Sequence, residues 1–445
     1  MGEDYMEKLY RIIDQKRGSY LDVLKEAVSI RSETGDQAET KKVISWAETK
    51  LRELGAATTS QDVGVIIVEG KKVKLPPVLI ADIKSDPSKV TLLVYGHLDV
   101  RPSRGSRSNI ETAEDYNLIE EDGVLFGKGV TDSKGPLLCW FNAIGAYREY
   151  GVELPINLRF VIEAMKESGS LGLLDYIHSN KDYLFKNVSY ICISDSSCLC
   201  STKPVITFGG RGCCKFMLTV EGGKVDLHSG VHGGMVSEPM NDLMSLLCSL
   251  TDNKGEIQVP NFRDNVEEVT PDEEKAYHRM SFDVSAFKRS VGVGKLLHKE
   301  DKKRLLMHST RFPSLSIHSI DTRNSDDDAI PSKVTASFTI RIVPNQTPQE
   351  VFHKVQVYLM YLFNRTQSPN QMTIEMPVAI PPWIAKPNDG NYKSASKAMH
   401  RVYKQEPDLI REGSSIPIVS ELQKVSGKSV LLLPVGCSAH SVLKN

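Results

Sequence analysis

The chain has 445 residues, more than one ordinary hydrophobic core organises, so two domains are expected. Hydrophobic residues make up 40% and charged residues 25% of the sequence, as in an ordinary globular protein. A net charge of -1 excludes a general attraction to nucleic acid or anionic membranes, and neither is an expected partner. The N-terminal segment has no basic region followed by an apolar run, and no segment approaches membrane-span length. We therefore expect a cytoplasmic protein.

The first part of the chain alternates predicted helices and strands. Residues 4–31 and 36–54 have apolar residues at spacings of three and four, which is typical of surface helices. Residues 90–100 are almost continuously apolar and end in polar residues, as a buried parallel strand does. Further helices are predicted at 134–150 and 169–177, and further strands at 156–163 and 188–194. This alternation predicts an α/β fold with a mostly parallel sheet flanked by helices.

The pattern changes near residue 209. Residues 215–220 and 333–343 alternate as half-exposed antiparallel strands do, with predicted helices near 238–251 and 350–364. After Pro381-Pro382 a helix near 390–404 and an apolar strand at 429–434 restore the earlier pattern. We therefore expect a discontinuous metal-binding catalytic domain of residues 1–208 and 382–445. An inserted α+β lid and dimerisation domain is expected to span residues 209–381.

Polar residues stand at or just after the ends of the predicted strands of the first domain. They are His97, Asp99, Asp132, Lys166, Glu167, Asp195 and His440. The carboxyl ends of parallel strands meet at one edge of a sheet, where α/β proteins place their sites. Clustered carboxylates repel one another unless cations balance them, and mixed nitrogen and oxygen ligands suit Zn²⁺ or Mn²⁺. The sequence therefore predicts a site for two divalent metal ions.

The metal ligands can be assigned within this set. Asp132 would bridge the two ions, His97 and Asp195 would complete one of them, and Glu167 and His440 the other. A water held between two such ions loses its proton near neutral pH and becomes a nucleophile. Asp99, two residues after His97, would orient the imidazole ring.

Each ligand has a simpler alternative when it is considered alone. A histidine at a strand end is more often a hydrogen-bonded structural residue, and Asp195 alone would more often cap a helix. Five suitable ligand types at consecutive strand ends favour the metal site over these separate explanations.

Sequence motifs almost from end to end resemble the M20 metallopeptidases, specifically the branch of cytosolic non-specific dipeptidase and carnosinase. The motifs are YGHLDV, GKGVTDSKGP, EAMKESGS, CISD, ITFGGRG, DLHSGVHGG, RFPSLSIH, IPSKV, TIRIVPNQTP, EPDLIREGSSIP and LLLPVG followed by AHS. The resemblance implies a two-domain fold, two Zn²⁺ or Mn²⁺ ions, hydrolysis of dipeptides, and a dimer formed through the inserted lid domain. It also implies the ligand set His97, Asp132, Glu167, Asp195 and His440.

The same resemblance implies substrate contacts in the inserted domain and near residue 415. His228 would reach the site of the partner subunit and stabilise the oxyanion, as a hydrogen-bond donor can. Arg341 offers a planar fork for the substrate carboxylate, and the segment containing Gly413, Ser415 and Ile416 would bind the same group through backbone amides. The simpler alternatives are a turn-capping His228 and a surface-paired Arg341.

Lys166 is the main departure from the family pattern. The family has two adjacent carboxylates in this segment, and the first is the general base; here the pair is Lys166-Glu167. An ammonium accepts no proton, so only a neutral lysine would serve as base; nearby metal charge lowers the pKa of a lysine and favours that form. General acid–base groups raise the catalytic rate by about a hundred- to ten-thousand-fold, and we expect a loss of rate of at least that order here.

Three other segments also depart from the family. The loop at 435–439 is short and lacks Asp-Asp-Gly, Gly413-Ser414 replaces two glycines at the carboxylate-binding turn, and SRGSRSNIETAEDYN replaces a Trp-containing loop. The family continues with a helix after the last motif, whereas this sequence ends at Asn445, and we expect a cost in stability.

Three functional hypotheses follow. The first is an active dipeptidase of reduced or altered efficiency. The second is a non-catalytic subunit that pairs with an active relative, as an alternative to a homodimer, and lends it His228. The third, another hydrolase such as a serine esterase, has little support because no GxSxG motif is present.

Overall fold

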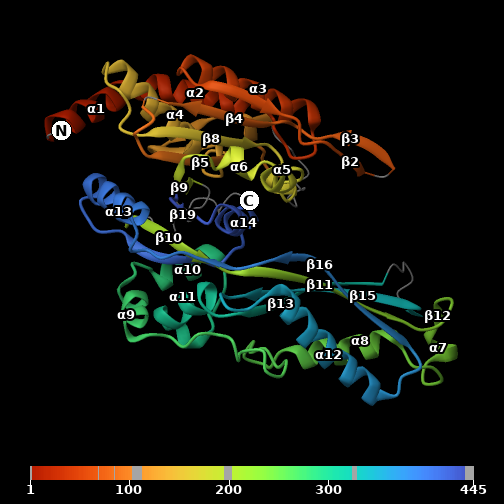
Figure 1. Cartoon of the computed structure of the whole chain (residues 1–445). Coiled ribbons are helices and arrows are strands. Elements are labelled where there is room, and N and C mark those ends of the chain that lie inside the picture. The colour runs from red at the N-terminus through yellow and green to blue at the C-terminus, as the bar shows by residue number, and fades with distance from the viewer. Residues whose placement is uncertain are drawn as a thin grey trace. The chain divides into compact units, whose positions relative to one another are not determined.

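The chain folds into two compact units (Figure 1). The computed structural model describes residues 3–68, 70–84, 86–102, 113–194, 203–322 and 328–435. Unit 1 comprises Met1–Thr207, Ala385–Leu409 and Glu421–Asn445, and unit 2 comprises Phe208–Ile384 and Ile410–Ser420. In the described residues, no helix combines the length and the apolar character that crossing a membrane requires.

A large sheet lies mainly in unit 1. Within the described residues it has nine strands, in the order β1-β4-β8-β5-β9-β19-β10-β17, with β18 paired to β10. Its strands are β1 (Ala57–Gln61), β4 (Val78–Ile83), β5 (Thr91–His97), β8 (Asn157–Glu163), β9 (Val188–Ile193), β10 (Val205–Gly210), β17 (Trp383–Ile384), β18 (Asp408–Glu412) and β19 (Ser429–Leu432). The central pairs β8–β5, β5–β9 and β9–β19 are parallel. The predicted α/β fold is therefore confirmed.

Helices cover this sheet and bury its apolar side chains. They are α1 (Glu3–Gln15), α2 (Arg17–Ser29), α3 (Gln37–Glu53), α4 (Lys134–Glu149), α5 (Leu173–Ser179), α6 (Lys181–Leu184), α13 (Gly390–Tyr403) and α14 (Pro417–Ser426). The core packs Val43 of α3 and Leu137 of α4 against Leu79, Val94 and Phe160 of the strands. Two short hairpins, β2 (Val65–Val68) with β3 (Lys71–Lys74) and β6 (Ile119–Glu121) with β7 (Val124–Phe126), complete the unit.

Two predicted elements differ from the observed ones. The single helix expected over residues 4–31 is broken at Lys16, whose backbone (φ -91°, ψ 5°) starts α2 anew. The break lets α1 pack separately on α4, where the Tyr5 ring lies 5.5 Å from that of Tyr150. The helix expected from residue 169 begins only at Leu173, because Gly169 and Gly172 have positive φ angles that α-helices exclude.

Unit 2 is built on a four-stranded antiparallel sheet in the order β13-β15-β11-β16. The strands are β11 (Gly212–Glu221), β13 (Ser314–Asp321), β15 (Lys333–Ile342) and β16 (Gln371–Ile380). The side chains of α8 (Pro239–Leu250) and α12 (Pro348–Thr366) share one core with these strands. The remaining elements are β12 (Leu227–His228), β14 (Ala329–Ile330), α7 (Ser229–His232), α9 (Pro271–Arg279), α10 (Val284–Val291) and α11 (Lys302–Thr310).

Stacked aromatic rings hold the centre of unit 2, and they provide a test of its packing. The Phe216 and Phe338 rings are 4.8 Å apart and nearly parallel, and both side chains are fully buried. Phe216→Ala should lower the free energy of unfolding by about 3–5 kcal/mol because it leaves a cavity. Urea unfolding measures the loss. Lys215→Ala, at the adjacent exposed position of β11, is the control, and an equal loss in both variants would refute this packing.

Candidate metal centre and substrate-binding residues

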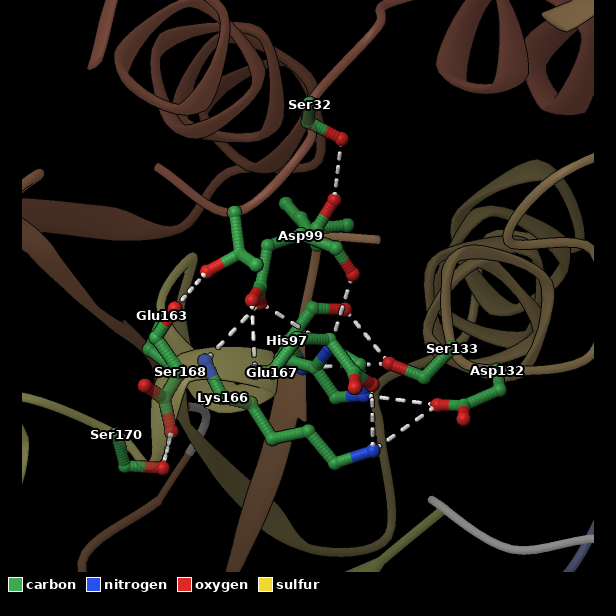
Figure 2. A network of polar contacts seen from close by, with 12 residues as sticks. Ser32, His97, Asp99, Asp132, Ser133, Glu163, Lys166, Glu167, Ser168 and Ser170 are labelled. Carbon is green, nitrogen blue, oxygen red and sulfur yellow. Dashed lines mark hydrogen bonds and ion pairs between the residues drawn. The ribbon is translucent and has the colours of Figure 1, made fainter. Parts of the chain in front are cut away.

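In the part of the chain that the structure describes, three side chains with metal-ligating atoms gather beside the carboxyl ends of β5 and β8 (Figure 2). His97 is the last residue of β5, and its partner across the parallel pair is Glu163, the last residue of β8. Asp132 lies just before α4, and Glu167 lies in the 3-10 turn Lys166–Ser168 that follows β8. One ligand atom from each of His97, Asp132 and Glu167 lies within 4.8 Å of the others.

Asp99 orients both His97 and the turn that carries Glu167. The Nδ1 atom of His97 lies 3.3 Å from Asp99 Oδ1, and its Nε2 atom lies 3.0 Å from Asp132 Oδ1. The Asp99 carboxylate also accepts the backbone N–H groups of Lys166 (3.2 Å) and Glu167 (2.9 Å). Burial raises the pKa of Asp99, but the bonds from His97 and from these two N–H groups outweigh it and lower that pKa. Asp99 therefore stays ionised and turns Nε2 of His97 toward Asp132.

Lys166 places a positive charge among the candidate ligands. Its Nζ atom lies 3.0 Å from Glu167 Oε1 and 3.3 Å from Asp132 Oδ1, as the dashed lines in Figure 2 show. The other oxygen of Glu167, Oε2, accepts a hydrogen bond from Arg101 Nε. The Lys166 side chain is 16% exposed and that of Glu167 only 4%. Among the described residues, two cationic side chains therefore lie against these two carboxylates.

The donor set fits a divalent ion, but Lys166 competes for the same oxygens. One imidazole nitrogen and two carboxylates are ligands that Zn²⁺ and Mn²⁺ accept. Coulomb repulsion between an ammonium and a dication about 4 Å apart is on the order of 8 kcal/mol at an effective dielectric constant of about 20. An ion bound at Glu167 would therefore have to displace the ammonium. The ligand roles predicted for Asp195 and His440 concern positions outside the described residues and stay predictions.

Glu163 is a buried carboxyl group beside this cluster that the sequence reasoning did not single out. Its Oε1 atom accepts hydrogen bonds from Tyr95 Oη (2.5 Å) and Ser170 Oγ (2.7 Å). Within the described part of the chain, its Oε2 atom has no hydrogen-bond partner. Burial raises the pKa of Glu163 to about 7. From sequence alone, a glutamate at a strand end could not be distinguished from an exposed ligand.

In unit 2, His228 has a local hydrogen bond that fixes its tautomer. It precedes α7, and its Nδ1 atom accepts the backbone N–H of Gly230 at 3.1 Å. The neutral ring therefore carries its proton on Nε2, which makes that atom a donor. The ring is exposed, so the capping role and a donor role toward a substrate are compatible.

Arg341 and Ser415, both predicted to bind substrate, contact each other within unit 2. Arg341 Nη1 donates to Ser415 Oγ at 2.9 Å, and that hydroxyl donates to the backbone carbonyl of Arg211 at 2.7 Å. Ser414, which stands where the family has a second glycine, donates its hydroxyl to Glu412 Oε1 at 3.0 Å. Ile416, also predicted to contribute to this turn, is buried.

Arg211 supports this turn and was missed by the sequence reasoning. Its guanidinium donates to the carbonyl of Gly413 at 2.9 Å and to the Ser314 hydroxyl at 3.0 Å. Burial, and then the positive charge of Arg341, lower the pKa of Arg211 to about 10. The signal available in the sequence was a charged residue directly after the apolar strand ITFGG.

The comparisons with known proteins agree with this architecture. Residues 93–442 match the family model described as Peptidase family M20/M25/M40. The chain is 39% identical over 440 residues to Beta-Ala-His dipeptidase of Homo sapiens, covering 97% of this chain and 86% of that protein. It is 38% identical over 447 residues to Cys-Gly metallodipeptidase dug1 of Schizosaccharomyces pombe, covering 98% and 93% of the two chains.

A solved structure gives the same result in three dimensions. The crystal structure of human carnosine dipeptidase 1 superposes with a TM-score of 0.86 at 38% identity, covering 97% of this chain and 92% of that one. The chain therefore belongs to peptidase family M20/M25/M40, and the resemblance noted from its motifs is confirmed.

The raised pKa of Glu163 predicts a pH-dependent stability. Below its unfolded-state pKa of 4.5 the group is protonated in both states, and above a folded-state value of about 7 burial of the charge destabilises the fold. Chelator-treated wild-type protein should therefore lose on the order of 3 kcal/mol between about pH 5 and about pH 8 through this group. Glu163→Gln should flatten that loss.

Urea unfolding at the two pH values measures the difference. Glu153→Gln, in which an exposed carboxylate is replaced, is the control and should keep the wild-type pH dependence. Identical pH dependence in wild type and Glu163→Gln would show that the buried carboxyl group does not carry the effect.

Proposed function

We propose that this chain is a metal-dependent dipeptidase in which Lys166 keeps turnover low. The proposal rests on one observation: the Lys166 ammonium lies 3.0 Å from Glu167 and 3.3 Å from Asp132, at the position of the family's general base. The dipeptidase names of the human and fission yeast relatives support the substrate class. A cytoplasmic location remains our prediction.

In this proposal the two units have separate tasks. Unit 1 is the metal-binding domain, in which His97, Asp132 and Glu167, together with Asp195 and His440, hold Zn²⁺ or Mn²⁺. When bound, such ions polarise the scissile carbonyl and activate water. Asp99 holds the imidazole of His97, and the protonated Lys166 has no lone pair with which to take a proton. The expected loss in rate is about a hundred- to ten-thousand-fold.

Unit 2 is the lid and dimerisation domain. Its Arg341 fork and the Gly413–Ser415 turn would bind the substrate carboxylate, because planar guanidinium donors match that group. His228 would donate its Nε2 proton to the oxyanion in a partner subunit. Strand β13 is an edge strand with exposed Ile317 and Ile320, and such an edge can pair with a second chain. The partner would be another copy of this chain or a related dipeptidase.

The second candidate function is a non-catalytic subunit of such a dimer. It is favoured by the two cations on Glu167, since Lys166 and Arg101 each engage one of its carboxylate oxygens. A carboxylate held in this way is a poorer metal ligand. A chain that does not turn over substrate would still offer His228 to an active partner.

Restoring a carboxylate at position 166 separates the two candidates. Lys166→Glu, loaded with Zn²⁺ or Mn²⁺, should hydrolyse a panel of dipeptides at least about 100-fold faster than wild type. Lys166→Gln is the control, since it removes the charge without supplying a base, and it should stay well below Lys166→Glu. If metal-loaded Lys166→Glu gains nothing, the catalytic proposal fails and the partner-subunit function remains.

Substrate recognition by Arg341 can be measured in the wild-type background, because slow turnover leaves a dipeptide intact during calorimetry. Arg341→Met should weaken dipeptide binding by about 10- to 100-fold, since charged hydrogen bonds contribute roughly 1.5–3 kcal/mol. Arg365→Met, in which an arginine that contacts Tyr361 on α12 is replaced, is the control. Equal affinities for wild type and Arg341→Met would place carboxylate recognition elsewhere.

A further inference from the structure

The ammonium of Lys166 is in direct contact with two of the three candidate metal ligands. We infer that it takes the place of one of the two metal ions, so that this chain binds a single divalent ion. The inference rests on the proposed metal-dependent function and concerns the same site. It makes a claim that the loss of a general base does not make, because a missing base alone leaves two ions in place.

The first argument is geometric. The Nζ atom bridges the carboxylates of Asp132 and Glu167 at 3.3 and 3.0 Å, so one cation links two side chains that would otherwise share a metal (Figure 2). The His97 Nε2 atom contacts the same Asp132 oxygen, Oδ1, at 3.0 Å. Among the described residues, the candidate position left for an ion is therefore beside His97 and Asp132, whose carboxylate is 53% exposed.

The second argument is that the Lys166 backbone is firmly held. Its N–H bonds the buried Asp99, its carbonyl accepts the N–H of Gly169, and the carbonyl of Met165 accepts those of Ser168 and Ser170. The Lys166 side chain is 16% exposed, which limits the directions in which the ammonium can leave. An ion that arrives at Glu167 therefore meets a cation whose backbone is fixed and whose side chain is mostly buried.

The third argument concerns charge. The carboxylates of Asp132 and Glu167 carry two negative charges, and Lys166 and Arg101 bring two positive charges to them. A pair of dications would compensate carboxylates that are already compensated and would be repelled by Lys166. Arg101 is 80% exposed and contacts Glu167, whereas Lys166 is 16% exposed and contacts both carboxylates, so we assign the exclusion of the second ion to Lys166.

The experiment counts bound ions. Chelator-treated full-length protein is titrated with Zn²⁺ and, separately, Mn²⁺ by calorimetry, and elemental analysis after dialysis gives the ions per chain. Wild type should bind one ion. Lys166→Met, which removes the charge without adding a nitrogen or oxygen ligand, should bind two ions. The second ion should bind at least about 100-fold more tightly than a second ion binds to wild type. Lys128→Met, in which a cation paired with Glu33 is replaced, should still bind one.

Electron paramagnetic resonance of Co²⁺-loaded protein gives a second measurement that does not depend on activity. Wild type should show the signal of an isolated ion, whereas Lys166→Met and Lys166→Gln should show the signal changed by coupling between neighbouring ions. Using both variants keeps the test valid if one of them fails to fold. Two ions per wild-type chain, or one ion in a folded variant without Lys166, would overturn the inference.

The result is distinguishable from a failure of the proposed function. One ion in wild type and two in Lys166→Met, with no hydrolysis by metal-loaded Lys166→Glu, would sustain the inference and reject the dipeptidase proposal. Two ions in wild type, with activity gained by Lys166→Glu, would do the reverse.

Discussion

The contact of the Lys166 ammonium with Asp132 and Glu167 is the interaction on which this site depends. Parallel strands bring acidic side chains to one edge of the sheet, and carboxylates brought together need positive charge beside them. Metal ions or protein cations can supply that charge. Here Lys166 and Arg101 supply it to Asp132 and Glu167 from the protein itself. The same lysine therefore affects catalysis, through the proton it cannot accept, and metal binding, through the oxygens it engages.

Polar residues next to the candidate ligands hold those ligands in position. Asp99 makes no contact with solvent, yet it sets the orientation of His97 and holds the turn that carries Glu167. In unit 2, Arg211 holds the turn near Gly413 by donating a hydrogen bond to the carbonyl of that residue. Arg341 lies at hydrogen-bond distance from Ser415 in the same turn. These supporting residues are buried and hydrogen-bonded, and their substitution would disturb binding through the groups they position.

Some of this organisation could be read from the sequence. The ends of apolar strands placed His97 and Glu167 at one edge, because parallel strands share that edge, and the α/β pattern follows from the same alternation. Lys166 and Arg101 contact the candidate ligands because of the directions in which their side chains point. The spacing of apolar residues in the sequence does not encode those directions. The break between α1 and α2 at Lys16 was also not predicted, because the apolar spacing in the sequence continues through it. The burial of Glu163 and Arg211 depends on tertiary packing. A single charged residue at or just after the end of an apolar strand indicates such burial only weakly.

The central claim is that a protein cation stands where the family places a second metal ion. Anomalous diffraction from wild-type crystals grown with Zn²⁺ tests it most directly, because each ion gives its own peak. One peak beside His97 and Asp132, with the Lys166 nitrogen still in contact with Glu167, is the predicted result. Two peaks on either side of Asp132, with the lysine side chain turned away from both carboxylates, would contradict it.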